Sequence, residues 1–269
     1  MAITNCLNFG NPKRPEIFWQ FKEAVGGMGE ACTILGTPVT GGNVSLYNES
    51  PIGAVYPTPT IGMVGLIEDV AHVTGLGFRN AGDSIVLLGE PTDELGASEY
   101  LAWIHGVVAG APPACDLKKE KALIDALLDA IHSGHVHSAH DCSEGGLAVA
   151  IAESAIADHD DLLGAELDLS AWSSLPLRAL LFGEAQARVV ISTADVPSVL
   201  AAAARHHVPA HVIGTVRDAA HGVSFTVGAR TVRANSATLA DAFHGAIPRA
   251  MRRAPAETVS SDLAAGVNV

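Results

Sequence analysis

Apolar residues near the start of the chain recur at helical spacing. Between residues 15 and 35 they return every three or four positions, at Ile17, Phe18, Phe21, Ala24, Val25, Met28, Cys32 and Leu35. This period predicts an amphipathic helix. Pro15 suits the first helical position, and Gly36 stands where a left-handed residue would end the helix. Residues 1–10 read as the end of a strand that runs into a glycine turn.

Shorter apolar runs follow, and each predicts one element. A second strong helix begins at Asp116, whose side chain can cap it, and ends at Gly134. The other predicted elements are a short strand with a glycine loop at 37–49, strands at 60–68, 84–89, 136–141, 163–168, 186–193 and 211–216, and helices at 97–108, 147–157 and 194–206.

Strands alternate with helices, but the strands are short and their connections vary in length. This pattern favours an α+β or mixed α/β fold in two layers over a doubly wound parallel sheet. The polar segment at 78–84 separates two apolar blocks, so we expect one domain at 1–80 and a second at 81–250. Residues 251–269 lack apolar periodicity, and we expect a disordered or loosely attached tail there.

Composition narrows the class of protein. Of 269 residues, 48% are hydrophobic and 17% charged, as in an ordinary globular protein, and the net charge is −13. The acidic balance disfavours nonspecific binding to nucleic acid or anionic membranes. With no apolar run long enough to cross a bilayer and no secretory signal, we expect a cytoplasmic protein. The four scattered cysteines lack a C-x-x-C pair and indicate reduced thiols.

The first candidate site is the run from Gly41 to Ser45. Paired glycines let a backbone approach a ligand and adopt positive φ, and successive N–H groups can cradle a phosphate. Asn43 offers a carbonyl oxygen to magnesium, and Ser45 offers a hydroxyl to a substrate. The alternative is a polar glycine turn between strands. The chain contains no G-x-x-x-x-G-K-[ST] phosphate loop.

The second candidate is the asparagine-rich segment from Asn5 to Pro12. Asn5 or Asn8 could bind a nucleotide hydroxyl, a base or a metal-bound water. The alternative is an Asx-turn network in which these side chains satisfy their own backbone.

The third candidate is the segment from His140 to Gly146, between a predicted strand and a predicted helix. Free N–H groups at such a junction can bind an anion. A catalytic pair of His140 with Asp141 is disfavoured because neighbouring strand residues point to opposite faces. No G-x-S-x-G surrounds Ser143, and nothing indicates a low thiol pKa at Cys142. The alternative is a capped helix start.

The fourth candidate is the segment from Phe182 to Arg188. Glu184, Gln186 and Arg188 could meet at a ligand. The alternative is the entry to a strand with polar residues at the surface.

Taken in order, these segments resemble the second half of the PurL-type synthase subunit family, phosphoribosylformylglycinamidine synthase. The resemblance runs from residue 1 to about residue 217, and NFGNP and GGNVSLYNE are its most specific parts. The segments that carry it are AITNCLNFGNPKRPEIFWQF, TPVTGGNVSLYNES, IGMVGLIEDV, ELGASEYL, SAHDCSEGGLAVAIAES and LFGEAQARVVIS.

The resemblance implies a PurM-like half, shared with aminoimidazole ribonucleotide synthetase: a truncated N-terminal α/β domain and a two-layer α+β C-terminal domain. It implies a ligase of de novo purine biosynthesis, which converts formylglycinamide ribonucleotide to formylglycinamidine ribonucleotide. ATP phosphorylates the formamide oxygen, and ammonia displaces the phosphate. The ammonia comes from glutamine through a glutaminase subunit or domain, and a small accessory subunit is a further partner.

The resemblance also implies roles for individual residues. Asn5, where many members have aspartate, and Gly42 would contact ATP, Asn43 would bind Mg²⁺, and Ser45 would touch the substrate. Lower-ranked nucleotide or phosphate contacts are Asp141, Ser143, Gly145 and Gly146. The family's catalytic histidines, ATP-binding lysine and most magnesium carboxylates lie in the first half of the subunit. We therefore expect no catalytic residue in this chain, and no activity without that N-terminal half.

Two other functions compete. These loops could hold a nucleotide as a non-catalytic scaffold within the same family. The chain could also be another phosphotransferase of the superfamily, but NFGNP and SLYNE argue against that.

Overall fold

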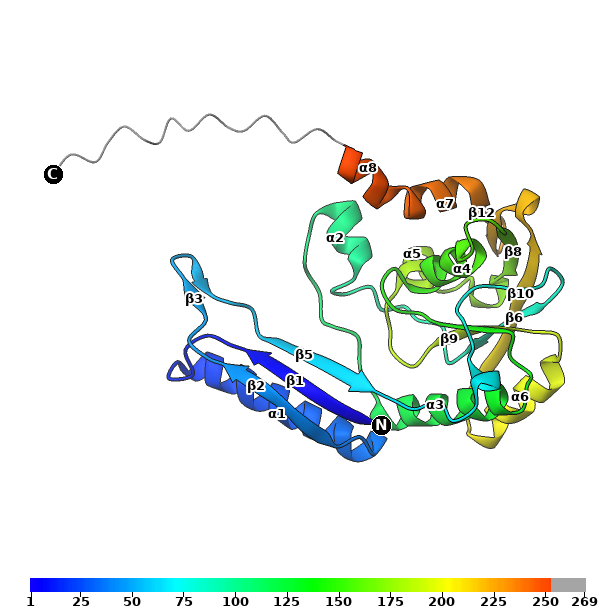
Figure 1. Cartoon of the computed structure of the whole chain (residues 1–269). Coiled ribbons are helices and arrows are strands. Elements are labelled where there is room, and N and C mark those ends of the chain that lie inside the picture. The colour runs from blue at the N-terminus through cyan, green and yellow to red at the C-terminus, as the bar shows by residue number, and fades with distance from the viewer. Residues whose placement is uncertain (253–269) are drawn as a thin grey trace, which may run out of the picture.

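The computed structural model describes residues 1–252 and arranges them as two lobes, each built on its own sheet (Figure 1). In the first lobe β1 (Ala2–Asn8) lies between β2 (Val39–Ser45), which is parallel to it, and β5 (Thr58–Val64), which is antiparallel. Parallel strands need a crossover connection, and α1 (Pro15–Leu35) supplies it.

The predicted ends of α1 are confirmed. Pro15 occupies the first turn, and Gly36 is left-handed with φ 64°, donating its N–H to the Cys32 carbonyl. The lobe's core consists of Leu7, Phe9 and Ile17, with partly buried residues of α1 around them. Only part of the apolar stripe is covered, because Phe18 and Val25 on α1 are exposed.

The prediction of a glycine loop at 37–49 is partly wrong. Gly41 and Gly42 lie inside β2 and pair with Thr4 and Asn5 of β1. Pairing with a neighbouring strand, which no local signal reveals, keeps this glycine pair extended. The irregular segment comes later and contains the short hairpin of β3 (Glu49–Ser50) and β4 (Gly53–Ala54).

The second lobe carries a seven-stranded sheet in the order β12-β11-β8-β10-β6-β9-β7. Every neighbouring pair is antiparallel except β8 and β11, so the preference for a mixed α/β fold over a doubly wound parallel sheet is confirmed. The strands are β6 (Ser84–Leu88), β7 (Ser138–Asp141), β8 (Leu163–Asp168), β9 (Val189–Thr193), β10 (Ala210–Asp218), β11 (Val223–Val227) and β12 (Arg230–Ala234).

Helices cover this sheet unevenly. On one face, α4 (Gly146–Ile156), α5 (Leu177–Phe182) and α7 (Ser236–His244) pack on a core that includes Ile85 and Leu87. On the other, α3 (Leu117–His132) and α6 (Val196–Arg205) pack on a core that includes Val86 and Leu88. Strand β6 is therefore buried on both faces, which explains its unbroken apolar sequence. A two-layer arrangement describes the β8–β10–β11–β12 side, and α3 and α6 add a layer elsewhere.

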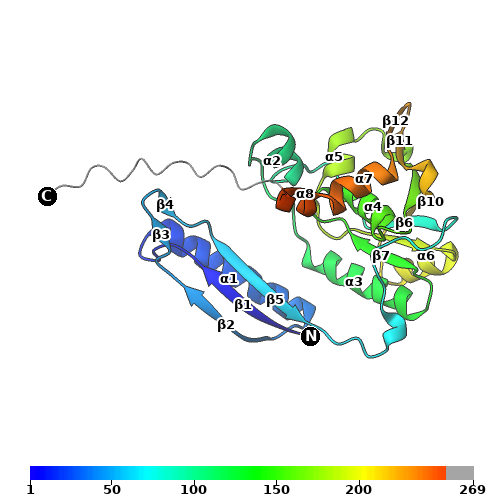
Figure 2. The ribbon, with the colours of Figure 1, turned by 45° about the horizontal axis from the view of Figure 1, so that its top comes forward.

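Some elements had no prediction, namely α5, β11, β12, α7, α8 (Ala246–Arg252) and the short turns η1 (Val70–His72), η2 (Ser170–Trp172) and η3 (Ala219–His221). The predicted helix at 97–108 is shorter, as α2 (Glu99–His105). Met251 and Arg252, assigned to the tail, belong to α8 instead, and the rest of the predicted tail, 253–269, lies outside the described residues (Figure 2).

The first sheet uses residues up to 64 and the second starts at 84, while the exact domain limits at 80 and 81 stay a prediction. No helix in the described part of the chain has the length and apolar character needed to span a bilayer.

Candidate functional site

The first group of predicted site residues meets on two neighbouring strands. Asn5 of β1 pairs with Gly42 of β2, and Asn8 pairs with Ser45. Gly42 has φ 148°, and a Cβ there would overlap the backbone oxygen of Asn5 and lie 2.8 Å from its Oδ1 atom. Glycine is required here because of the close approach of β1, whether or not a ligand binds.

Register and strand alternation divide this group between two faces of the sheet. Asn43 and Ser45 share a face, and Asn43 Nδ2 lies 3.5 Å from Ser45 Oγ. Asn5 lies on the opposite face, with Leu7 and the α1 core. A ligand that contacts all four predicted residues must therefore reach around β2, which is an edge strand of the described sheet.

The Asx-turn interpretation of the asparagine segment holds for Asn11, whereas Asn8 bonds to other side chains. Asn8 Nδ2 donates to Cys6 Sγ, Asn8 Oδ1 accepts from Asn48 at 3.3 Å, and Asn11 Oδ1 accepts from the Lys13 N–H at 2.9 Å. Within residues 1–252, the side chain of half-buried Asn5 makes no such hydrogen bond. Asn5 is thus the member of this segment whose amide is free for a ligand.

A complete magnesium site does not form from the described residues alone. Asn43 contributes one neutral amide oxygen, and residues 1–252 contain no group of three His, Cys, Asp or Glu side chains that could hold a metal. Protein-bound Mg²⁺ commonly relies on one or two carboxylates together with phosphate oxygens and waters. Asn43 fits the role of a single ligand in a site completed by other groups.

The second group meets where β7 runs into α4. His140 lies between two carboxylates, with Nδ1 3.2 Å from Asp141 Oδ1 and Nε2 2.8 Å from Glu153 Oε2. The expectation that His140 and Asp141 point apart is wrong, because Asp141 ends the strand and the chain turns there. The Ser143 hydroxyl donates to Asp141 Oδ2 and holds the pKa of that carboxyl below its usual range. Both ring nitrogens of His140 are engaged.

Two predicted phosphate donors at this junction already have partners. The Gly145 N–H donates to Glu184 Oε1 at 2.8 Å, and the Gly146 N–H donates to the Ser143 carbonyl at 2.9 Å. The contacts predicted for Asp141, Ser143, Gly145 and Gly146 stay a prediction. A phosphate at Gly145 would have to displace the Glu184 carboxylate.

The segment from 182 to 188 does not converge on one ligand. Arg188 is buried, with 4% exposure, and donates to the Gly183 and Ala185 carbonyls. Gln186 is exposed, while Glu184 points to the start of α4. Burial lowers the pKa of Arg188 and raises that of Cys142 to about 11, which agrees with a weak nucleophile at Cys142.

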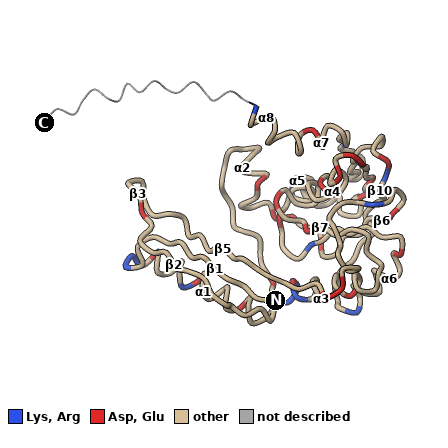
Figure 3. Tube along the Cα trace, in the orientation of Figure 1, with Lys and Arg blue, Asp and Glu red and all other residues tan. Residues whose placement is uncertain are grey.

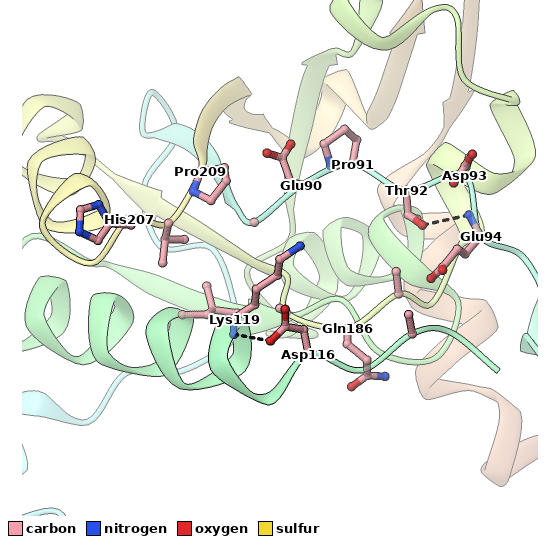
Figure 4. Close-up of a pocket in the computed structure, with 16 residues that line it drawn as sticks. Glu90, Pro91, Thr92, Asp93, Glu94, Asp116, Lys119, Gln186, His207 and Pro209 are labelled. Carbon is pink, nitrogen blue, oxygen red and sulfur yellow. Dashed lines mark hydrogen bonds between the residues drawn. The ribbon is translucent and has the colours of Figure 1, made fainter. Parts of the chain in front are cut away.

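A cavity of about 460 Å³ lies beside the start of α3, and residues 185–187 of the fourth candidate segment line part of it. Figure 4 shows Lys119 reaching into it between Glu90 and Asp116, with Gln186 on its wall. Four carboxylates and one ammonium group line it, so its charge does not favour a phosphate. Sequence reasoning missed this cavity because its residues come from four distant segments, 89–94, 114–123, 185–187 and 207–209. Along the Cα trace, the Lys and Arg positions are scattered among the described elements (Figure 3).

Comparison with known proteins adds independent findings. Residues 1–67 match the N-terminal domain of the AIR synthase related proteins, and residues 80–226, more than half the chain, match the C-terminal domain. A phosphoribosylformylglycinamidine synthase subunit PurL from Moorella thermoacetica is 51% identical over 234 residues, which are 86% of this chain and 31% of that protein. The chain thus spans about a third of the length of this relative.

Solved structures show the same fold. Thermotoga maritima PurL complexed with ATP superposes with a TM-score of 0.68 at 20% identity, over 89% of this chain and 37% of that one. The same protein complexed with FGAR also gives a TM-score of 0.68 at 20% identity, with 89% and 39% covered. These likenesses concern the fold of both lobes.

Proposed function

The chain belongs to the AIR synthase related protein family, and from that membership we propose that it is part of a phosphoribosylformylglycinamidine synthase subunit of the PurL type. The reaction is the ATP-dependent amidation of formylglycinamide ribonucleotide in de novo purine biosynthesis. The class is a carbon–nitrogen ligase that uses ammonia derived from glutamine. In this proposal the protein acts in the cytoplasm, where soluble metabolic enzymes work.

One observation carries the proposal: the two most specific segments, NFGNP and GGNVSLYNE, lie side by side. NFGNP begins at the last residue of β1, GGNVS forms most of the neighbouring strand β2, and backbone hydrogen bonds link Phe9 and Gly10 to the segment 45–48. In this arrangement Asn5 and Gly42 contact ATP on one face, while Ser45 contacts the substrate on the other. Asn43 would supply one oxygen to a Mg²⁺ ion, and the other ligands would have to come from outside the described residues. The ion, when bound, neutralises phosphate charge during phosphoryl transfer.

In this proposal the described residues of the chain position the reactants, and any acid or base comes from the rest of the subunit. Phosphoryl transfer depends mainly on alignment and on charge stabilisation. Asn5 is neutral, so its amide orients the nucleotide by hydrogen bonding without adding charge. Transfer of the γ-phosphoryl group to the formamide oxygen creates a leaving group, and attack by ammonia then releases phosphate and leaves the amidine.

The chain covers only part of the length of its relatives, and this indicates which partners it needs. The Moorella relative is about three times as long, so we propose that the rest of such a subunit completes the active site. The uncovered sheet of the first lobe supports this, since β2 and β5 both have free edges in the described residues and Val44, Ile61 and Met63 are exposed. A glutaminase subunit or domain and a small accessory subunit are the further partners; a Thermotoga maritima assembly is named PurLQS.

The test is an amidation assay with ATP, formylglycinamide ribonucleotide and ammonia. We expect product when the chain is combined with the remaining part of a PurL subunit, and none from the chain alone. Ser45→Ala should raise the KM for the ribonucleotide in that assembly, whereas Ser50→Ala, in the exposed β3–β4 hairpin, should not. Product from the chain alone would contradict the need for a completing half.

The scaffold alternative predicts a different result. Calorimetry with ADP would show tight binding that the remaining part of the subunit leaves unchanged, and no amidation would appear in the combined assay. That pair of outcomes would replace the catalytic proposal with a non-catalytic nucleotide-binding role.

A further inference from the structure

Glu184 lies where three segments that are distant in the sequence meet. Its Oε1 atom accepts hydrogen bonds from the Gly145 N–H at 2.8 Å and from the Glu99 N–H at 2.9 Å. Gly145 precedes the first turn of α4, and Glu99 is the first residue of α2. A single carboxylate oxygen thus joins the starts of two helices, where partial positive charge favours an anion.

Helix α2 is held mainly at its first turn. Ser98 is 3% exposed and its hydroxyl donates to the Leu95 carbonyl at 2.7 Å, while the Tyr100 ring stacks on Phe182 with centroids 5.1 Å apart. Farther along, no residue of α2 is buried, and Trp103 is 82% exposed. Two of the contacts that hold α2 are made with the segment 182–184: the Glu99 N–H donates to Glu184, and the Tyr100 ring stacks on Phe182.

Hydrogen bonds from the buried Arg188 side chain hold the backbone on both sides of Glu184. Arg188 donates from Nη2 to the Gly183 carbonyl at 2.5 Å and from Nε to the Ala185 carbonyl at 3.2 Å. Gly183 itself is packed so closely that a Cβ would overlap the Glu94 carbonyl oxygen. Arg188 is buried, so these bonds are shielded from water. The segment therefore presents the Glu184 carboxylate from a fixed position.

We propose that Glu184 is a positioning residue that fixes the start of α2 and the turn at 143–146 as one unit. The two hydrogen bonds that Glu184 Oε1 accepts, called the Glu184 bridge below, are part of the fold itself. The consequence of this bridge rests on the proposed function, because Ser143 and Gly146 in this turn are predicted nucleotide contacts and their geometry would then set the affinity for nucleotide. The Gly145 N–H, which Glu184 holds, is not counted among those contacts. The residue acts through two backbone N–H groups and touches no reacting atom.

Hydrogen exchange of the full chain tests the bridge. In Glu184→Ala the amides of Glu99 and Gly145 should both exchange roughly 10-fold faster or more, since each loses a bond to a charged acceptor. Glu184→Gln keeps an oxygen at the acceptor position and should restore most of the protection. Glu144→Gln, an exposed neighbour in the same turn, is the matched control and should change neither amide.

The joint response of two distant amides is the diagnostic result. Faster exchange at only one of them, or at neither, would overturn the proposal. Protection of β6, at residues 84–88, reports whether the core stays folded and separates loss of the bridge from general unfolding.

Calorimetry with ADP on the same variants tests the consequence. We expect weaker binding by Glu184→Ala and nearly normal binding by Glu184→Gln. Unchanged ADP affinity despite a broken bridge would overturn the positioning role. Absence of ADP binding by the unaltered chain would instead count against the proposed nucleotide function, and the exchange data alone would then decide whether Glu184 fixes the two segments.

Discussion

Replacement of Gly42 by alanine should unfold the pairing of β1 with β2. With φ 148° at Gly42, the added Cβ would overlap the backbone oxygen of Asn5, and it would lie 2.9 Å from that carbonyl carbon. A backbone carbonyl cannot rotate away as a side chain would. The strands must separate, or Gly42 must change its φ angle.

The cost has two parts. A residue forced into a sparsely populated backbone region costs roughly 1–3 kcal/mol. Strand separation would weaken about two ladder hydrogen bonds, each contributing about 1 kcal/mol. We therefore expect Gly42→Ala to lower the free energy of unfolding by roughly 3–5 kcal/mol.

The neighbouring glycine supplies the control. A Cβ on Gly41 would meet no atom of the described residues within 4 Å, so Gly41→Ala should raise the free energy of unfolding by about 0.4–1 kcal/mol. Urea denaturation followed by circular dichroism gives the two free energies, and hydrogen exchange at 2–8 and 39–45 locates the damage. Equal effects of the two substitutions would refute the steric argument and leave a general loss of glycine flexibility as the cause.

Three further predictions concern the second lobe. Ser143→Ala should raise the pKa of Asp141, which an NMR titration can measure. The ionised Asp141 carboxylate stabilises the fold above its unfolded pKa, and this stability is lost as pH falls through the lowered folded pKa, so the variant should gain less stability from it. An unchanged pKa would contradict the role of the hydroxyl. Cys142, 5% exposed with a pKa of about 11, is about 0.1% thiolate at pH 8 and should react with iodoacetamide only on unfolding, so mass spectrometry that finds native labelling would disprove its shielding. His137→Ala removes the 2.7 Å partner of the buried Asp83 carboxylate and should lower the free energy of unfolding by about 1–3 kcal/mol, and a negligible change in a denaturation curve would show that the pair is unimportant.

Helices with clear end signals were predictable from the sequence. Asp116 accepts from the N–H groups of Lys118 and Lys119, as its position before α3 indicated, and Gly36 ends α1. These signals are local, because a cap and its helix lie within a few residues of each other. Strand β6 was predictable for a similar reason, since burial on both faces leaves a continuous apolar run.

Elements defined by distant partners were missed. Strand β12 is exposed along residues 230–233, and within residues 1–252 it pairs only with β11, so it carries no apolar alternation. Gly41 and Gly42 have turn composition, yet pairing with β1 makes them a strand. In both cases hydrogen bonds to another segment decide the conformation, and local propensity does not.

The sequence by itself determined the family, the caps of the long helices and the types of residue available for nucleotide binding, since each of these depends on residues close together or on an ordered set of motifs. Only the tertiary structure decided which of those residues meet. It placed Asn5 and Ser45 on opposite faces of one sheet, turned Arg188 inward, and brought Glu184 to the backbone of Glu99 and Gly145. Such contacts join segments tens of residues apart, and their geometry follows from strand register and helix packing, which no short stretch of sequence specifies.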